Sequence, residues 1–432
     1  MRMRQYKHSG IPWMKQIPEN WSVVRGKDFL YLMSRPVRED DDVVTCFRDG
    51  EVVLRSERRT EGFTMSDKEI GYQGINKGDI VIHGMDGFAG AMGVSKSTGK
   101  GSPVLIVCNP KSDDDARFVI YYLRSLAMNN VFVALATGIR ERSCDLRWNK
   151  ISVLPFVRPP FTEQKKIADF IDMKSAEIDS LIALQEQMIE KLKAYRQSVI
   201  TEAVTKGLDP NAKLVPSGID WIGEIPEGWE VNKLFNLCTI KGRVGWKGLR
   251  SDEFKENSYA YLVTGQDFVS SDINWNNCYQ IDKERYDEDP YIQLTNGDIL
   301  VTKDGSIGKI AKVSGMDKPA CLNSGIFVLK QRKDTFFQDY LYWYLASPLL
   351  LRYNTFINTG GTTIIHLYQN VFERFSMIVP PYHIQQEIAI YLDEKCADID
   401  CLIALKQQKI EKLKDYKKSV IYEAVTGKTT IE

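Results

Sequence analysis

Two long stretches of the chain carry apolar residues at heptad spacing and contain no proline or glycine. The first lies between Pro160 and Gly207, and the second follows Pro381. In a heptad pattern, two positions per repeat form an apolar seam along one face of a helix. The predicted seam residues are Ile171, Ile178, Leu181, Met188, Leu192, Tyr195 and Val199 in the first stretch, and Leu392, Ile399, Leu402, Leu413, Tyr416 and Val420 in the second. Each stretch predicts a helix of about 40 residues, roughly 60 Å long.

A helix of this length cannot bury its seam alone, so the two predicted helices are expected to pair with each other. Each is preceded by a domain of about 155 residues, which lets the chain run out along one helix and return along the other. This topology predicts an antiparallel coiled coil with a globular domain at each end and a pseudo-two-fold axis. Gln185 and Lys406 interrupt the seam at its middle layer. They form either a buried polar layer that sets the register or part of a hydrated edge.

The segments that precede the helices read as short β-branched strands bounded by glycine, asparagine and aspartate. A helix is expected after each set of strands, near residues 115–128 and 335–346, because Asp113 to Asp115 and Asp334 suit a helix start. The strands are expected at residues 79–83, 91–95 and 103–108, and again at 298–302, 308–313 and 325–330. Without regular βαβ alternation, the predicted fold class is α+β, with two globular domains separated by the coiled coil.

The chain is a tandem duplication. The Trp13–Trp21 segment, with Ile17-Pro18-Glu19 between the tryptophans, recurs in register as Trp221–Trp229. Residues 167–205 and 388–426 are identical at 25 of 39 positions without a gap. Tryptophan segments of this kind are expected to pack in the core or against a helix. The predicted organisation is a first domain at 1–160, a helix at 161–206, a linker and second domain at 207–382, and a second helix at 383–432.

Composition narrows the class of protein. The chain has 432 residues, of which 43% are hydrophobic and 26% charged, as is typical of a globular protein. No apolar run is long enough to span a bilayer and no signal peptide is evident, so a cytoplasmic protein without membrane contact is expected. Eight cysteines without a CxxC pair, and four scattered histidines, argue against a disulfide framework or a metal site.

Two similar domains with diverged surfaces suit a ligand with two different parts, and DNA is the obvious one. Two half-sites on one face of a duplex lie one helical turn apart, roughly 34–36 Å between centres. Because the two domains differ, the predicted site is asymmetric. The alternative is a coiled-coil scaffold whose end domains bind other proteins.

The chain resembles the specificity subunit of type I restriction-modification systems. The resemblance rests on the two-tryptophan segment with Ile-Pro-Glu, on the Gly297–Val301 and Asp304–Lys309 run, and on Pro-Pro-x3-Gln before each long helix. It covers essentially the whole chain, in duplicate and in the right order. The first domain departs from the pattern, since Gly84–Gly90 stands where the second domain has Lys303–Gly308. Residue roles therefore do not transfer simply between the copies.

The resemblance implies that each copy is a target recognition domain followed by a conserved spacer helix. It implies a non-catalytic chain that reads double-stranded DNA and docks two methyltransferase subunits, which bind S-adenosylmethionine and flip out an adenine. Restriction (translocase) subunits that use ATP would complete the assembly. S-adenosylmethionine, ATP and Mg²⁺ would be held by these partners, with no cofactor in this chain. Docking of the methyltransferase is then the alternative role for the tryptophan segments.

DNA contacts must come from local clusters, because the 57 basic and 57 acidic residues cancel. Residues 1–160 carry 24 basic and 19 acidic residues, and residues 207–381 carry 18 and 21. Cations are expected on phosphates, and polar groups on base edges. The candidates in the first domain are Arg55, Arg58, Arg59, Lys96, Lys100, Arg140, Arg142 and Arg147. Those in the second are Lys241, Arg243, Lys247, Arg250, Lys303, Lys309, Thr362, Thr363 and His366. For each one, a solvated surface side chain is the competing interpretation.

Motifs for catalysis are incomplete. Gly99-Lys100-Gly101 resembles the end of a phosphate-binding loop, but Gly101 stands where serine or threonine is needed. Val379-Pro380-Pro381-Tyr382 resembles the motif of amino-methyltransferases, but Val379 replaces the asparagine or aspartate that must accept from the target amine. The paired prolines are better explained as a helix start. No catalytic residue is therefore predicted.

Overall fold

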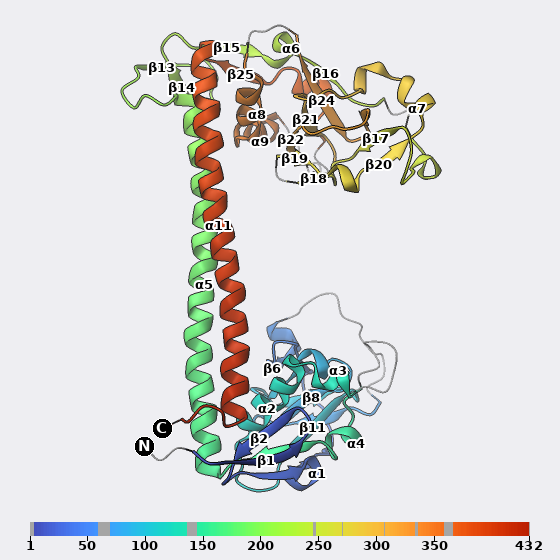
Figure 1. The fold of residues 1–432 in the computed structure, drawn as a ribbon, viewed down its shortest axis with the longest axis vertical. Helices are drawn as coiled ribbons and strands as arrows, with labels where there is room; N and C mark the ends of the chain where they lie inside the picture. The colour runs from blue at the N-terminus through green and yellow to red at the C-terminus, as the bar shows by residue number, and fades with distance from the viewer. Residues whose placement is uncertain are drawn as a thin grey trace. The chain divides into compact units, whose positions relative to one another are not determined.

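The computed structural model describes two compact units. One unit consists of residues 1–186 and 407–432, and the other of residues 187–406; they are called the first and second unit below. The residues described are 4–58, 70–135, 145–244, 248–269, 271–305, 307–332, 336–357 and 366–431. Both units combine strands with helices, as expected for an α+β protein (Figure 1).

The two long helices form as predicted. Helix α5 spans Phe161–Lys206 and helix α11 spans Tyr382–Val425. Each begins after the paired prolines, where a residue without a free N–H is tolerated. The glutamine of the Pro-Pro-x3-Gln motif folds back over this start: Nε2 of Gln164 donates to the Pro159 carbonyl at 2.9 Å, and Nε2 of Gln385 donates to the Pro380 carbonyl at 2.8 Å. The motif therefore ties the first turn of each long helix to the proline that precedes it, in both copies.

The two helices run antiparallel in each unit. In the first unit, Lys417 pairs with Asp179 at 2.7 Å, and further along α11, Val425 shares a core with Ile171. In the second unit, Arg196 pairs with Asp400 at 3.1 Å, and further along α5, Val204 shares a core with Leu392. Residue numbers rise along one helix as they fall along the other. The predicted antiparallel pairing is confirmed.

One of the two predicted seam positions is wrong. Leu181 and Leu402 are 45% and 47% exposed, and Tyr195 and Tyr416 are also exposed. The heptad position one residue later faces inward instead. At this position Ile189 and Ile410 are buried, and Ile182 and Ile403 are half-buried. Two apolar stripes lie side by side on each helix, and heptad spacing alone does not tell which of them faces the partner. Met188 is exposed on the same stripe as Leu181.

The other seam position is confirmed. Its members are buried or half-buried, and they are Ile171, Ile178, Leu192, Val199, Leu392, Ile399, Leu413 and Val420. Of the two polar residues in the middle layer, Gln185 is buried in the first unit and Lys406 is half-buried in the second. The ammonium of Lys406 lies 3.3 Å from the sulfur of Met188.

Each unit is built on an antiparallel sheet of four strands. In the first unit the order is β4 (Leu30–Leu32), β11 (Leu105–Pro110), β8 (Ile80–His83) and β9 (Met92–Val94). In the second unit it is β16 (Cys238–Lys241), β24 (Ile326–Gln331), β21 (Ile299–Thr302) and β22 (Ile310–Lys312). The expected strands of both copies are confirmed, and equivalent strands occupy equivalent places.

Helices follow each set of strands as expected. Helix α2 (Ala116–Met128) begins at Asp115, whose carboxylate accepts from the Arg117 N–H at 2.8 Å. Helix α8 (Gln338–Ala346) takes the corresponding place in the second unit. Apolar residues on each helix, such as Phe118 and Tyr340, complete the cores of their units.

The second unit also carries a three-stranded sheet, which the sequence patterns did not reveal. Strands β20 (Tyr279–Ile281), β17 (Ala260–Val263) and β23 (Ala320–Leu322) form this sheet, and β17 pairs with β23 in parallel. It encloses a separate apolar cluster around Leu262.

The remaining elements are short. In the first unit they are β1 (Tyr6–Ile11), β2 (Met14–Pro18), β3 (Ser22–Arg25), α1 (Gly26–Phe29), β5 (Val44–Cys46), β6 (Val52–Leu54), η1 (Arg55–Glu57), β7 (Gln73–Ile75), η2 (Gly87–Ala89), β10 (Gly99–Gly101), α3 (Val131–Ala134), α4 (Trp148–Ile151) and β12 (Pro155–Arg158). In the second unit they are β13 (Leu214–Pro216), β14 (Glu224–Pro226), β15 (Glu230–Lys233), α6 (Leu234–Leu237), η5 (Ser251–Glu253), β18 (Phe268–Val269), β19 (Asp272–Ile273), η6 (Trp275–Asn277), α7 (Lys283–Asp287), η7 (Pro290–Ile292), α9 (Leu349–Ile357), α10 (Gln369–Phe372) and β25 (Ser376–Val379).

The repeated tryptophan segments hold the ends of the long helices. In the first unit, Trp21 is buried and packs against Gly427, which ends α11 with φ +70°. A Cβ atom at Gly427 would lie 3.1 Å from the Trp21 ring. In the second unit, Gly207 ends α5 with φ +78°, and a Cβ atom there would lie 3.0 Å from Trp229. The expected structural role of these tryptophans is confirmed, and each unit is closed by a helix end from the other copy.

None of the helices within the described ranges is long and apolar enough to cross a membrane. The cysteines in the same ranges are free thiols.

Candidate nucleic-acid interface

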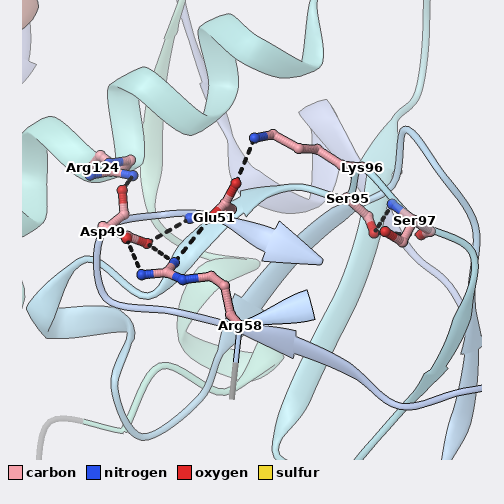
Figure 2. A network of polar contacts seen from close by, with 7 residues as sticks. All are labelled: Asp49, Glu51, Arg58, Ser95, Lys96, Ser97 and Arg124. Atoms are coloured by element: carbon pink, nitrogen blue, oxygen red, sulfur yellow. Dashed lines mark hydrogen bonds and ion pairs between the residues drawn. The ribbon is translucent and has the colours of Figure 1, made fainter. Parts of the chain in front are cut away.

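In the first unit, the fold brings together two candidate cations that lie far apart in the sequence. Arg58 follows the β5–β6 hairpin, and Lys96 follows β9. The guanidinium of Arg58 lies 2.8 Å from the Asp49 carboxylate and 3.1 Å from that of Glu51. The ammonium of Lys96 lies 2.8 Å from the other oxygen of Glu51. Figure 2 shows that Glu51 thereby bridges the two cations.

This network holds Arg58 and Lys96 while leaving them reachable from solvent. The Arg58 guanidinium also lies 4.2 Å from the centre of the Phe47 ring, which orients it. Its hydrogen bond to Asp49 lowers the pKa of that carboxyl group. Both cations remain exposed. They can exchange a carboxylate for a phosphate, because exposed ion pairs are worth only about 0–1 kcal/mol.

Sequence patterns did not identify Arg124 as part of this network. Arg124 lies on α2, and its guanidinium donates to the backbone carbonyl of Asp49 (Figure 2). Burial lowers the pKa of Arg124. Nearby, the Ser95 hydroxyl donates to the Ser97 carbonyl at 2.7 Å and shapes the loop that carries Lys96. The available sequence signal was an arginine among the mostly apolar residues of this helix.

The other described candidates of the first unit are more dispersed. Arg55 is half-buried, with Nε 3.4 Å from the Thr45 hydroxyl. Lys100 is half-buried on β10. Arg147 is exposed and pairs with Asp145 at 2.6 Å. Three further candidates, Arg59, Arg140 and Arg142, lie outside the described residues.

In the second unit, candidates gather at the turn after β21. Lys303 and Lys309 flank this turn, and the Lys303 ammonium lies 5.2 Å from the centre of the Phe327 ring. His366 reaches the same turn: its Nδ1 lies 2.7 Å from Oδ1 of Asp304. Lys309 and His366 are exposed. The turn thus presents two cations, an imidazole and a carboxylate.

Arg243 differs from the other candidates because its side chain is used inside the protein. It is 3% exposed, and its Nε donates to the Leu322 carbonyl at 2.9 Å. Its Nη2 lies 3.5 Å from the sulfur of Cys321. In this conformation, no phosphate could reach its guanidinium.

The remaining candidates of the second unit lie near its smaller elements. The Lys241 ammonium lies 5.6 Å from the centre of the Tyr291 ring. Arg250 is exposed, and its backbone N–H donates to the Glu253 carboxylate at 2.7 Å. Lys247, Thr362 and Thr363 lie outside the described residues. Within those described, no three histidine, cysteine or acidic side chains gather in a way that could hold a metal ion.

The sequence matches a known family of domains. Residues 226–415 match the model of the type I restriction modification DNA specificity domain. The type I restriction enzyme MjaVIII specificity subunit of Methanocaldococcus jannaschii is 26% identical over an alignment that covers 100% of this chain and 98% of that protein.

The fold is also similar to solved structures. A chain from a structure described as "Structural basis underlying complex assembly and conformational transition of the type I R-M system" has a TM-score of 0.72, with 96% of this chain and 99% of that chain covered, at 15% identity. The HsdS subunit of Thermoanaerobacter tengcongensis has a TM-score of 0.53, with 96% and 98% covered, at 16% identity.

Proposed function

We propose that the chain is a specificity subunit of the type I restriction-modification family and that it reads an asymmetric, bipartite DNA site, with one recognition domain per half-site. The observation that carries the proposal is the four-stranded sheet, which is built twice with the same strand order. The surfaces attached to the two sheets differ. The first unit has the Arg58–Lys96 network, and the second has the Lys303–Lys309 turn.

The cations at these two places supply affinity, and polar groups beside them supply sequence discrimination. Arg58, Lys96, Lys303 and Lys309 would contact phosphates. In the first unit, DNA must displace Asp49 and Glu51 from their cations. This exchange has a low energetic cost because the pairs are exposed, and it disfavours any ligand that offers no anion in return.

We also propose that each unit docks one methyltransferase subunit on the exposed stripe of its helix pair. In the first unit the stripe contains Leu181 and Leu184 on α5 and Tyr416 on α11. In the second unit the equivalent residues are Leu402, Leu405 and Tyr195. Apolar side chains kept exposed at equivalent places favour a protein partner. Because the stripe occurs twice, it favours two copies of one partner.

The family relatives are specificity subunits, so this chain recognises DNA and leaves catalysis to other subunits. S-adenosylmethionine would bind to the methyltransferase, and ATP and Mg²⁺ to the restriction subunit. We place the assembly in the cytoplasm with its DNA.

DNA binding is tested with the chain in complex with its methyltransferase, by gel shift over a series of salt concentrations. Lys309→Ala is expected to weaken binding to all sequences alike and to reduce the salt slope by about 1. Lys213→Ala is the matched control, because it removes an exposed cation from the linker. A complex that binds every duplex equally would refute sequence recognition and favour the scaffold alternative.

A separate assay tests the absence of catalysis. The purified chain is incubated with DNA, Mg²⁺ and S-adenosylmethionine, and neither methylation nor cleavage is expected. Either activity from the chain alone would refute its assignment as a recognition subunit.

A further inference from the structure

The same turn of the two recognition domains carries an exposed aspartate. Asp86 follows β8 and Asp304 follows β21, which are equivalent strands of the two sheets. A glycine comes next in both copies, as Gly87 and Gly305. The side chains of Asp86 and Asp304 are 38% and 43% exposed.

In the second unit, a histidine from a distant segment holds one oxygen of this carboxylate. Nδ1 of His366 lies 2.7 Å from Oδ1 of Asp304. The backbone ties the two segments together, because the Leu367 N–H donates to the Lys303 carbonyl at 3.0 Å. Among the residues that the structure describes, Oδ2 of Asp304 has no hydrogen-bond partner. It lies 3.7 Å from where a Cβ atom of Gly325 would stand, so this glycine leaves space beside it.

In the first unit, a different residue holds the corresponding carboxylate. Nη2 of Arg48 donates to Oδ1 of Asp86 at 2.8 Å. The Asp86 N–H donates to Nδ1 of His83 at 3.0 Å, which fixes the turn. Oδ2 of Asp86 lies 3.8 Å from that nitrogen, beyond hydrogen-bond distance. The two copies therefore share a partly exposed carboxylate with one oxygen held by a hydrogen bond, although the residues that hold it are unrelated.

Stability does not explain why both copies keep this arrangement. An exposed ion pair contributes about 0–1 kcal/mol. A carboxylate beside Lys303 and Lys309 would also repel a nearby phosphate. A base edge is different, because the exocyclic amine of cytosine or adenine is a hydrogen-bond donor in the major groove, and carboxylates accept from it.

We propose that Asp86 and Asp304 each accept a hydrogen bond from an exocyclic base amine, one in each half-site, with Arg48 and His366 as positioning residues. This inference rests on the proposed DNA-reading function. It assigns a specificity contact to the same turn of both domains. Arg48 and His366 act by fixing the carboxylate that reads the base.

The test uses the complex with the methyltransferase and a panel of duplexes in which each base pair of the recognised site is replaced in turn. Binding is measured at low salt, so that weak variants stay in range. For the wild type, replacing the contacted pair should weaken binding about 5- to 150-fold, since a good base contact is worth about 1–3 kcal/mol. Asp304→Ala, which removes the acceptor, should abolish this penalty at one position of one half-site only. Asp86→Ala should do the same in the other half-site. The identity of the position distinguishes cytosine from adenine.

Matched controls remove a carboxylate from an exposed site elsewhere in the same unit: Glu256→Ala in the second unit and Asp40→Ala in the first. Both control variants should keep the loss of binding that each base-pair replacement causes in the wild type. His366→Ala should reduce the Asp304-dependent penalty without moving it to another position. If Asp304→Ala and Asp86→Ala fold normally and keep the binding penalty at every position, the inference is overturned while DNA reading stands. If the wild type shows no penalty at any position, the proposed function itself fails.

Discussion

Arg243 shows how burial separates a structural cation from a binding cation of the same unit. A buried guanidinium is tolerated only when its donors are satisfied, and Arg243 donates to the Leu322 carbonyl. Arg243→Ala is therefore expected to destabilise the protein by about 2–4 kcal/mol, because it leaves that carbonyl and a cavity behind. Arg250→Ala, at an exposed position, should change stability by less than about 0.5 kcal/mol. Urea unfolding of the two variants checks this, and equal effects would contradict the contrast.

The environment of His83 predicts a pH dependence of stability. Burial lowers the pKa of His83 in the folded protein, although the Asp86 carboxylate partly opposes this. As the pH falls below about 6.5, the unfolded chain takes up this proton more readily than the folded chain. The contribution of neutral His83 is present above that pH and is lost on acidification.

The matched variant is His83→Gln, whose amide oxygen can still accept from the Asp86 N–H and does not titrate. Its melting temperature should fall less between pH 7.5 and pH 5.5 than that of the wild type. Thermal unfolding at the two pH values measures the difference. An equal loss in both proteins would show that His83 is not the titrating group.

At the scale of elements, the helix pair has one buried and one exposed apolar stripe. Ile178 and Ile399 are buried in the seam, so Ile178→Ala is expected to cost about 2–5 kcal/mol. Leu181 is exposed three residues further on, and Leu181→Ala should change stability by less than about 0.5 kcal/mol. Chemical unfolding of the two variants distinguishes the stripes. A large loss of unfolding free energy in Leu181→Ala would show that Leu181 belongs to the buried seam.

The exposed stripe should matter for the partner instead. The double variant Leu181→Ala and Leu402→Ala is expected to weaken methyltransferase binding at least about 10-fold, because exposed apolar anchors account for much of the energy of an interface. Isothermal titration with the purified methyltransferase measures this. Lys174→Ala, which removes an exposed ion pair with Glu177, is the control. Unchanged affinity of the double variant would exclude the stripe as the docking surface.

The elements that sequence patterns predicted are those whose signal is local. The strands of both central sheets are short β-branched runs between glycines, and the long helices are bounded by prolines and glycines. The sheet around β17 was missed because its parallel pairing with β23 joins residues 59 apart in the sequence, so no local pattern records it. The same limit applies to the candidate site. Arg58 and Lys96 are visible as cations, but their joint contact with Glu51 and the link from Arg124 to Asp49 exist only in the fold.

The whole molecule is a duplication in which each unit borrows a helix end from the other copy. Tyr340 of the second unit donates to the Val204 carbonyl on α5, and Tyr6 of the first unit donates to the Gly427 carbonyl after α11. The long helices and the tryptophan segments must therefore stay matched between copies. The surfaces of the two domains, which lie in the sequence between these matched segments, are free to diverge.

This division predicts that recognition is modular. The described residues between 22 and 155 contribute nothing to either apolar cluster of the second unit, so replacing this segment with the corresponding segment of a relative should leave that unit intact. The helix ends and Trp13–Trp21 stay native and continue to close the first unit. Sequencing of methylated DNA from cells that carry the complete system should then show a change in one half of the recognised site and none in the other. A change in both halves would mean that the two domains do not read DNA independently.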